Sequence, residues 1–158
     1  MRLKMSASYT LSMKILVLNG PNLNLLGTRE PDHYGQASLA QVQLLCEQTV
    51  HALGHELEFF QSNHEGVLID KIHAAGQAYQ AGELLGAVFN PGAFTHTSVA
   101  LHDAIKGTGL PVVEVHISNV HAREAFRHHS YVSPVAAGVV VGLGVQGYVL
   151  AIQGLVSL

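Results

Sequence analysis

Hydrophobic residues gather in five short runs along the chain, and each run is bounded by polar or turn-forming residues. The runs cover residues 14–19, 56–61, 84–90, 111–116 and 138–141. Short apolar runs rich in β-branched residues and bounded by turn signals are typical of buried strands. We therefore predict five strands. The first and third end in the turn-rich tetrapeptides that begin at Asn19 and Asn90.

Between these runs the apolar residues change to a helical spacing. Val42, Cys46 and Val50 recur four residues apart, behind a capping-box pattern at Ser38-x-x-Gln41, and the stripe stops at Gly54. Cys46 is expected to be a small core residue because it lies on this stripe. Further helices are predicted from about residue 65, from near residue 95 and over residues 145–156. The segments up to residue 36 and from 117 to 133 are predicted to be polar loops.

Strands and helices alternate in the order βαβαβαβ-loop-βα, without a repeat or a linker. This order predicts an α/β protein with a parallel sheet covered by helices on both faces, joined by right-handed crossovers. Five strands favour the flavodoxin-like three-layer fold with strand order 2-1-3-4-5. We expect one domain over residues 14–158 and a short tail over residues 1–13.

Composition narrows the function classes. The 158 residues include 8 Lys and Arg against 11 Asp and Glu, a net charge of −3, which argues against nucleic-acid or anionic-membrane partners. Only 12% of residues are charged and 48% are hydrophobic, which excludes disorder and suits an oligomer. The single cysteine rules out an intrachain disulfide, and no apolar run reaches the roughly 18 residues of a membrane span. We expect a cytoplasmic protein.

Polar residues end three of the predicted strands. Asn19 and Asn22 follow the first strand, Asn90 ends the third, and Glu114 and His116 end the fourth. Ligands of open α/β sheets bind beyond the carboxyl ends of the strands, so these side chains should meet in one crevice. Glu114 and His116 are two residues apart and share a face, so the carboxylate can fix the tautomer of the imidazole.

Three other chemistries fit the sequence less well. The segment 142–147 matches G-x-G-x-x-G, but the following strand and the acidic residue of a dinucleotide site are missing, so tight packing is the better explanation for its glycines. The eleven histidines show no H-E-x-x-H pattern, and we expect no metal site. None of the four lysines ends a strand, which argues against imine chemistry.

Several ordered blocks together carry a family resemblance. They are residues 19–27 (NGPNLNLLG), 29–31 (REP), 34–35 (YG), 90–98 (NPGAFTHTS), 114–119 (EVHISN) and the Arg and Ser-Tyr of 127–131. The chain resembles the type II 3-dehydroquinate dehydratases from residue 14 to its last helix. The resemblance implies a flavodoxin-like enzyme, a hydro-lyase without metal or cofactor, that assembles as a homododecamer of trimers.

The resemblance also implies a reaction. Members of this family dehydrate 3-dehydroquinate to 3-dehydroshikimate by anti elimination through an enolate, in aromatic biosynthesis or in quinate breakdown. By resemblance, Tyr34 is the base and His116 the acid. Arg29 favours the phenolate, Glu114 orients His116, and Asn22 holds a water at the developing enolate.

The same resemblance implies a substrate-binding set and a shared site. The matching residues are Asn90, His96, Asp103, Ile117, Ser118 and Arg127. Ile117 and Ser118 would offer backbone N–H groups, and Asp103 would reach into the site of a neighbouring subunit. Two alternatives without catalysis stay open: a flavodoxin-like module that binds a nucleotide or another small molecule, and a silent oligomeric scaffold. A bound chromophore or nucleotide would indicate the first, and indifference to loss of Tyr34 and His116 would indicate the second.

Overall fold

The computed structural model describes residues 11–28 and 30–158 and contains one five-stranded parallel sheet. The strand order is β2-β1-β3-β4-β5, which confirms the predicted fold. The strands are β1 Lys14–Asn19, β2 Glu56–Gln61, β3 Leu84–Asn90, β4 Val112–His116 and β5 Gly138–Val141. All carboxyl ends of a parallel sheet lie at one edge, so the polar residues that end β1, β3 and β4 come together there.

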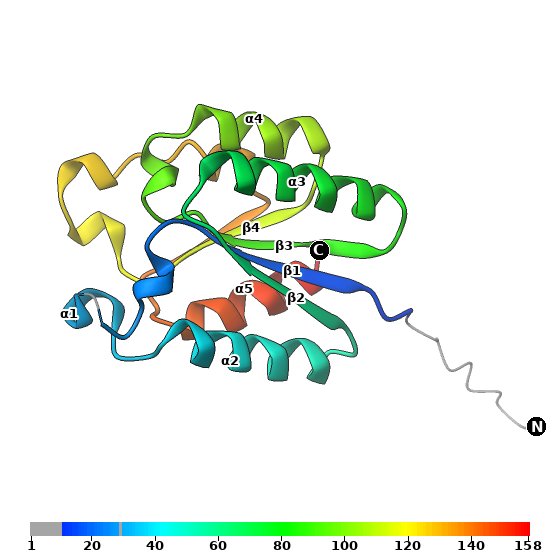
Figure 1. The fold of residues 1–158 in the computed structure, drawn as a ribbon, viewed down its shortest axis with the longest axis horizontal. Coiled ribbons are helices and arrows are strands. Elements are labelled where there is room, and N and C mark those ends of the chain that lie inside the picture. Colours follow the sequence, from blue (N-terminus) through cyan, green and yellow to red (C-terminus); the bar gives the residue numbers. More distant parts are fainter. Residues whose placement is uncertain (1–10, 29) are drawn as a thin grey trace, which may run out of the picture.

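Helices cover the sheet on both faces, as Figure 1 shows. Helices α2 and α5 pack on one face, and α3 and α4 pack side by side on the other. A fifth, single-turn helix, α1, lies beyond the carboxyl ends of the strands. The helices are α1 Pro31–Tyr34, α2 Leu39–Ala52, α3 Glu65–Gln80, α4 Val99–Thr108 and α5 Gln146–Val156.

The protein has two hydrophobic cores, one on each face of the sheet, because successive side chains of β1 point to opposite faces. Ile15 and Val17 pack with α2 and α5, whereas Leu16 and Leu18 pack with α3 and α4. Because both faces of the central strands are covered, β1 reads as a continuous apolar run after its first residue. Cys46 is fully buried in the first core, and burial raises the pKa of its thiol to about 12, so the expected structural role fits.

Local signals place most helix ends. The Ser38 hydroxyl accepts a hydrogen bond from the Gln41 N–H, and the Gln41 side chain accepts one from the Ser38 N–H, which confirms the capping box. The prediction that the third helix starts near Thr95 was wrong. Residues Gly92–His96 form a 3₁₀ segment, and α4 begins at Val99 because the Ser98 hydroxyl caps the Leu101 N–H.

The first predicted loop was also not wholly irregular. The Glu30 carbonyl accepts hydrogen bonds from the His33 and Tyr34 N–H groups at 2.9 and 3.1 Å, and this closes the single turn of α1. Two short 3₁₀ turns, Val120–Ala122 and Ala125–Arg127, lie within the second predicted loop, and a third, Ser133–Val135, begins at its last residue. These turns matter because they aim side chains at the carboxyl edge of the sheet.

One glycine sets how closely two strand ends approach. A Cβ on Gly20 would lie 2.4 Å from the Pro91 carbonyl oxygen, and the Gly20 N–H donates to the Asn90 carbonyl at 2.8 Å. Only glycine allows this contact, which brings the turns after β1 and β3 together. Among the described residues, none of the helices has the length and apolar character to cross a membrane. The expected cytoplasmic location and the domain bounds stay predictions.

Candidate active site

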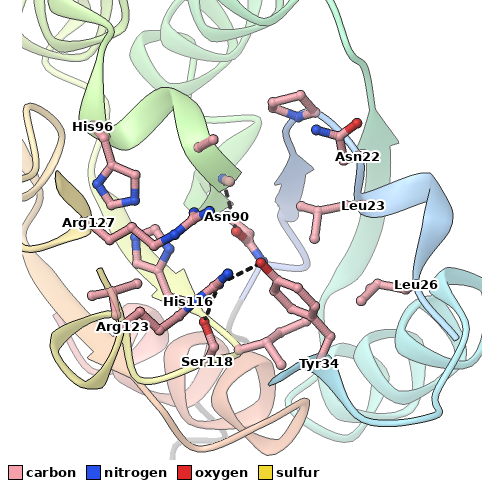
Figure 2. Close-up of a pocket in the computed structure, with 15 residues that line it drawn as sticks. Asn22, Leu23, Leu26, Tyr34, Asn90, His96, His116, Ser118, Arg123 and Arg127 are labelled. Carbon is pink, nitrogen blue, oxygen red and sulfur yellow. Dashed lines mark hydrogen bonds between the residues drawn. The ribbon is translucent and has the colours of Figure 1, made fainter. Parts of the chain in front are cut away.

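One pocket lies at the carboxyl edge of the sheet, between the turns after β1 and β3, the end of β4 and the segment that follows it. It is lined by apolar side chains together with a few converging polar ones, as is typical of small-molecule sites. In Figure 2, Asn22, Leu23 and Leu26 lie on one side and His96, His116 and Arg127 on the other. The lining residues are Pro21, Asn22, Leu23, Leu26, Tyr34, Asn90, Gly92, Ala93, His96, His116, Ile117, Ser118, Val120, Arg123 and Arg127.

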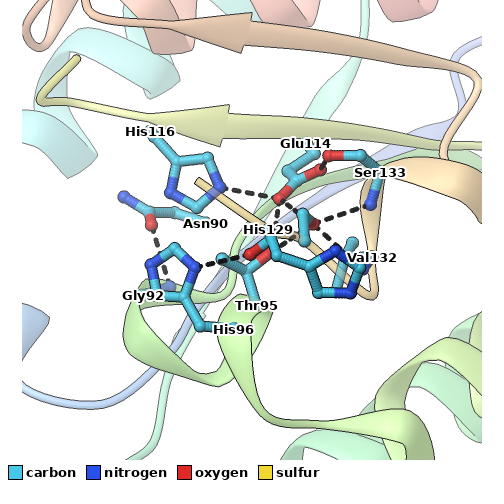
Figure 3. A network of polar contacts seen from close by, with 10 residues as sticks. Asn90, Gly92, Thr95, His96, Glu114, His116, His129, Val132 and Ser133 are labelled. Carbon is cyan, nitrogen blue, oxygen red and sulfur yellow. Dashed lines mark hydrogen bonds and ion pairs between the residues drawn. The ribbon is translucent and has the colours of Figure 1, made fainter. Parts of the chain in front are cut away.

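His116 is paired with a fully buried carboxylate. Its Nε2 lies 2.7 Å from Oε1 of Glu114, as expected for residues that share a face of β4. A carboxylate can only accept, so Nε2 carries the hydrogen and Nδ1 is left for the pocket. Figure 3 shows that hydroxyl groups surround the same carboxylate. Thr95 and Ser130 donate to Oε1 at 2.6 and 3.1 Å, and Ser133 donates to Oε2.

These contacts keep Glu114 ionised inside the protein. Burial by itself would raise the pKa of the carboxyl group, but the hydrogen bond and charge of His116 and the hydroxyls of Ser133 and Thr95 outweigh it. The net result is a pKa below the ordinary value of 4.5. An ionised Glu114 accepts the Nε2 hydrogen of His116 and fixes the orientation of the ring. The pair can therefore take part in proton transfer at Nδ1, on the pocket side.

A second pair faces the pocket from the loops. The Arg123 guanidinium donates to the Tyr34 hydroxyl oxygen at 2.7 Å and to the Ser118 hydroxyl at 3.3 Å. The Arg123 side chain is only 6% exposed. Its Nε makes no hydrogen bond within the described part of the chain and lies 3.7 Å from the Glu124 carboxylate. The hydrogen bond places a buried cation directly on the phenol oxygen of Tyr34, at the wall of the pocket.

Two further groups line the wall of the pocket opposite Asn22. Nδ1 of His96 lies 2.8 Å from the His129 carbonyl oxygen, so Nδ1 donates and Nε2 of the neutral ring is an acceptor. Burial, with the charges of His116 and Arg127, lowers the pKa of His96 despite the bond to His129, and the neutral form is favoured. Nε of Arg127 donates to the Glu124 carboxylate at 2.9 Å, which leaves the rest of its donor fork for a ligand.

Two asparagines line the pocket: Asn22 lies at its rim and Asn90 at its floor. Asn22 adopts a left-handed backbone with φ of 67°, which asparagine tolerates better than most residues, and its N–H donates to the Asn63 side chain at 2.9 Å. Asn90 is 3% exposed, and its side-chain oxygen accepts from the Gly92 N–H at 3.1 Å. Of the strand-end residues predicted to meet in one crevice, Asn22, Asn90 and His116 line the pocket, whereas Asn19 and Glu114 are buried outside its lining.

Most of the expected site residues meet in this one pocket. Asn22, Tyr34, Asn90, His96, His116, Ile117, Ser118 and Arg127 line it, with Glu114 directly behind His116. Asp103 does not: it is exposed on α4 and is not part of the lining. Arg29 lies outside the described residues. In the described ranges, no group of three or more His, Cys, Asp or Glu side chains could hold a metal ion.

Sequence reasoning missed several residues that the site uses. Arg123 contacts Tyr34, and Thr95, Ser130 and Ser133 surround Glu114. A second arginine four residues before Arg127 was the only signal for Arg123. Nothing in the sequence marks which arginine is buried. The three hydroxyl residues come from two segments far apart in the chain, so no local pattern could have found them.

Comparison with known proteins agrees with the geometry. A family model described as "Dehydroquinase class II" matches residues 13–156. The chain belongs to the class II dehydroquinase family. This confirms the resemblance predicted from the sequence blocks, together with the enzyme class, a hydro-lyase.

Individual 3-dehydroquinate dehydratases and type II dehydroquinases resemble the chain over about nine tenths of its length. It is 74% identical to a 3-dehydroquinate dehydratase of Marinomonas sp. (strain MWYL1), over 90% of this chain and 95% of that protein. It is 68% identical to one of Variovorax paradoxus (strain S110), over 90% and 98%. The crystal structure of a type II dehydroquinase from Butyrivibrio crossotus superposes with a TM-score of 0.85 at 47% identity, covering 91% of this chain and 97% of that one.

Proposed function

We propose that the protein dehydrates 3-dehydroquinate to 3-dehydroshikimate by anti elimination through an enolate, without a metal, cofactor or imine. The observation that supports this most directly is the pairing of Tyr34 with a buried arginine in a pocket that also holds the His116–Glu114 pair. One pair suits a base and the other an acid. An elimination that removes a proton and a hydroxyl group needs both.

The base in this proposal is the phenolate of Tyr34. It takes the C2 proton next to the C3 carbonyl of the substrate, and the electron pair moves onto the carbonyl oxygen to form the enolate. Arg123 stabilises the phenolate before the transfer, and the matching role of Arg29 stays a prediction. Asn22, at the pocket rim, would hold a water against the enolate oxygen.

The acid is the imidazolium of His116. The enolate collapses, the C1–oxygen bond breaks, and His116 gives its Nδ1 proton to the departing hydroxyl, which leaves as water. Glu114 accepts the Nε2 hydrogen throughout and stabilises the charge on the ring. The proton taken by Tyr34 must then return through solvent to His116 before the next turnover.

The charge and hydrogen-bonding capacity of the pocket support a polyhydroxylated anion as the substrate class. Arg123 and Arg127 supply positive charge, and no Asp or Glu within residues 11–28 and 30–158 is among those that line the pocket. The N–H groups of Ile117 and Ser118 beyond β4 would take the carboxylate. His96 would accept from a ring hydroxyl, and Arg127 would donate to one.

The experiment is ultraviolet absorbance of the purified protein mixed with 3-dehydroquinate alone, before and after borohydride treatment. We expect an enone-carboxylate band that grows with time and survives borohydride. A band abolished by borohydride would point to a lysine imine and contradict the enolate route. No band would contradict the dehydratase, and a bound nucleotide in the same sample would then favour the binding module.

We also propose that the chain assembles as a homododecamer of trimers in which Asp103 completes a neighbouring site. Asp103 is exposed on α4, and Val99, one turn earlier, is 53% exposed, as suits a helix face that another copy covers. Asp103→Ala should raise KM several-fold or lower the mass measured by light scattering. Wild-type values for both would contradict the shared site.

A further inference from the structure

Tyr148 on α5 lies behind the pocket. This side chain is fully buried in the core between α2, α5 and the sheet, and yet it carries a hydroxyl group. A buried hydroxyl must be hydrogen-bonded to be tolerated. The hydroxyl of Tyr148 donates to Oδ1 of Asn19 at 2.7 Å and accepts from Nδ2 of Asn90 at 2.9 Å.

These contacts belong to a longer chain of hydrogen bonds. Nδ2 of Asn19 donates to the Phe60 carbonyl oxygen at 3.3 Å, at one end of the chain. At the other end, the Gly92 N–H donates to Oδ1 of Asn90 at 3.1 Å. The chain therefore runs from the backbone of β2, through the ends of β1 and α5, to the floor of the pocket.

The two backbone anchors fix the direction of every bond between them. A carbonyl oxygen only accepts, so Asn19 must turn its amide nitrogen to Phe60 and its oxygen to Tyr148. Tyr148 must then donate to Asn19, and its oxygen is free to accept from Asn90. The Gly92 N–H only donates, so it independently requires the Asn90 oxygen on its own side. The Phe60 carbonyl at one end of this series of hydrogen bonds and the Gly92 N–H at the other therefore require the same orientation of the Asn90 amide.

We propose that Tyr148 is a positioning residue that locks the orientation of the Asn90 amide for the substrate. This inference rests on the proposed function, in which Asn90 binds the substrate. With Tyr148 and Gly92 satisfied, the amide presents its second N–H and the second lone pair of its oxygen to the pocket in fixed places. A free amide could flip and exchange donor for acceptor, which would offer the wrong partner to a ring hydroxyl or carbonyl.

The test is a double-mutant cycle between Tyr148→Phe and Asn90→Ala, read as kcat and KM for 3-dehydroquinate. Tyr148→Phe keeps the ring and removes only the hydroxyl. We expect it to lower kcat/KM about 10- to 100-fold in the wild-type background and by less than about twofold in the Asn90→Ala background, because the two residues act as a unit. The pH profile of kcat should not move, since Tyr34 and His116 are untouched.

Matched controls separate positioning from stability. Tyr79→Phe makes the same chemical change in the opposite core, and Ile152→Val weakens α5 one turn after Tyr148 without touching a hydrogen bond. Both should keep wild-type kcat/KM. If Tyr148→Phe does not fold, Asn19→Ala tests the same chain from its far side. It should lower kcat/KM in the same direction, and again only when Asn90 is present.

The outcomes are distinct. An inactive wild-type protein overturns the proposed function and the inference with it. An active wild-type protein with Tyr148→Phe at the level of Tyr79→Phe overturns the inference alone. Equal losses in both Asn90 backgrounds also overturn it, because they would mean that Tyr148 acts on the whole fold and not through Asn90.

Discussion

The two sides of the pocket are built from different parts of the molecule. His116 sits at the end of a central strand, and its partner Glu114 is held by hydroxyls from two segments that pack on the sheet. Tyr34 sits at the end of a single-turn helix between polar loops, and its hydrogen bond from Arg123 joins two segments outside the sheet. After the roles proposed for His116 and Tyr34, we call these the acid side, which belongs to the core, and the base side, which belongs to the loops.

This difference separates two tasks. In the proposed mechanism the acid needs a carboxylate held beside it, and strand β4 places Glu114 two residues from His116 on the same face. A base that must meet a substrate proton can lie on a segment that closes when the ligand is present. Variants on the acid side should therefore change stability and pH response, whereas variants on the base side should change mainly the rate.

Tyr34→Phe should have the largest effect and tests the base side directly. Removal of the hydroxyl deletes the proposed base, so we expect kcat to fall about 10²- to 10⁴-fold with KM within a few-fold of wild type. Steady-state kinetics with 3-dehydroquinate measure this. Tyr79→Phe is the matched control and should retain full activity. Near wild-type turnover in Tyr34→Phe would remove Tyr34 as the base.

Arg123→Met should come next. Loss of the charge-assisted hydrogen bond to Tyr34 should lower kcat about 10- to 100-fold, because the buried arginine no longer holds the Tyr34 hydroxyl in place. Arg123→Lys should recover part of this loss. Arg127→Met should mainly raise KM and leave kcat near the wild-type value. A wild-type kcat in Arg123→Met would show that other groups hold Tyr34.

Glu114→Gln tests the acid side through stability. The pKa of Glu114 is below 4.5 in the folded protein, so the unfolded chain binds the proton more tightly. The contribution of the carboxylate is therefore complete above about pH 4.5 and is lost as the pH falls through the folded value. We expect the gap in the free energy of unfolding between wild type and Glu114→Gln, from urea titrations, to shrink as the pH is lowered from 6 toward 3.

Two further variants test whether the pH dependence of stability comes from Glu114 and its hydrogen bonds. Glu83→Gln changes an exposed carboxylate and should give a gap that varies little over the same range. Ser133→Ala removes one hydroxyl from Glu114 and should weaken the acid dependence only in part, at a cost of about 1 kcal/mol. A gap between wild type and Glu114→Gln that stays constant with pH would mean that the carboxylate is not held ionised by its neighbours.

The fold was largely predictable because its signals are local. Each strand is a short apolar run, and the Ser38 capping box marks one helix start. The start of α4 was misplaced because Thr95 was read as helical, whereas its hydroxyl bonds to Glu114 across the structure. Thr95 and Glu114 are 19 residues apart in the sequence, and Thr95 lies in the 3₁₀ segment Gly92–His96 that precedes α4.

The site was predictable only in part, for a related reason. Strand ends pointed to Asn22, Asn90, Glu114 and His116, and the family resemblance supplied Tyr34 and Arg127. Tyr148 lies in the helix predicted over residues 145–156, and its hydroxyl donates to Asn19, which is 129 positions away in the chain. Such partners depend on the finished fold, and no spacing in the sequence reveals them.

The contact between Gly20 and Pro91 has a consequence for changing what the pocket accepts. No side chain can be added at residue 20 without separating the ends of β1 and β3, so the floor offers almost no latitude to an engineer. Leu23, Leu26 and Val120 also line the pocket, but they are buried, so the fold tolerates best the apolar exchanges that nearly conserve their volume. A library aimed at new ring substituents should leave the asparagine turns intact and vary those three positions.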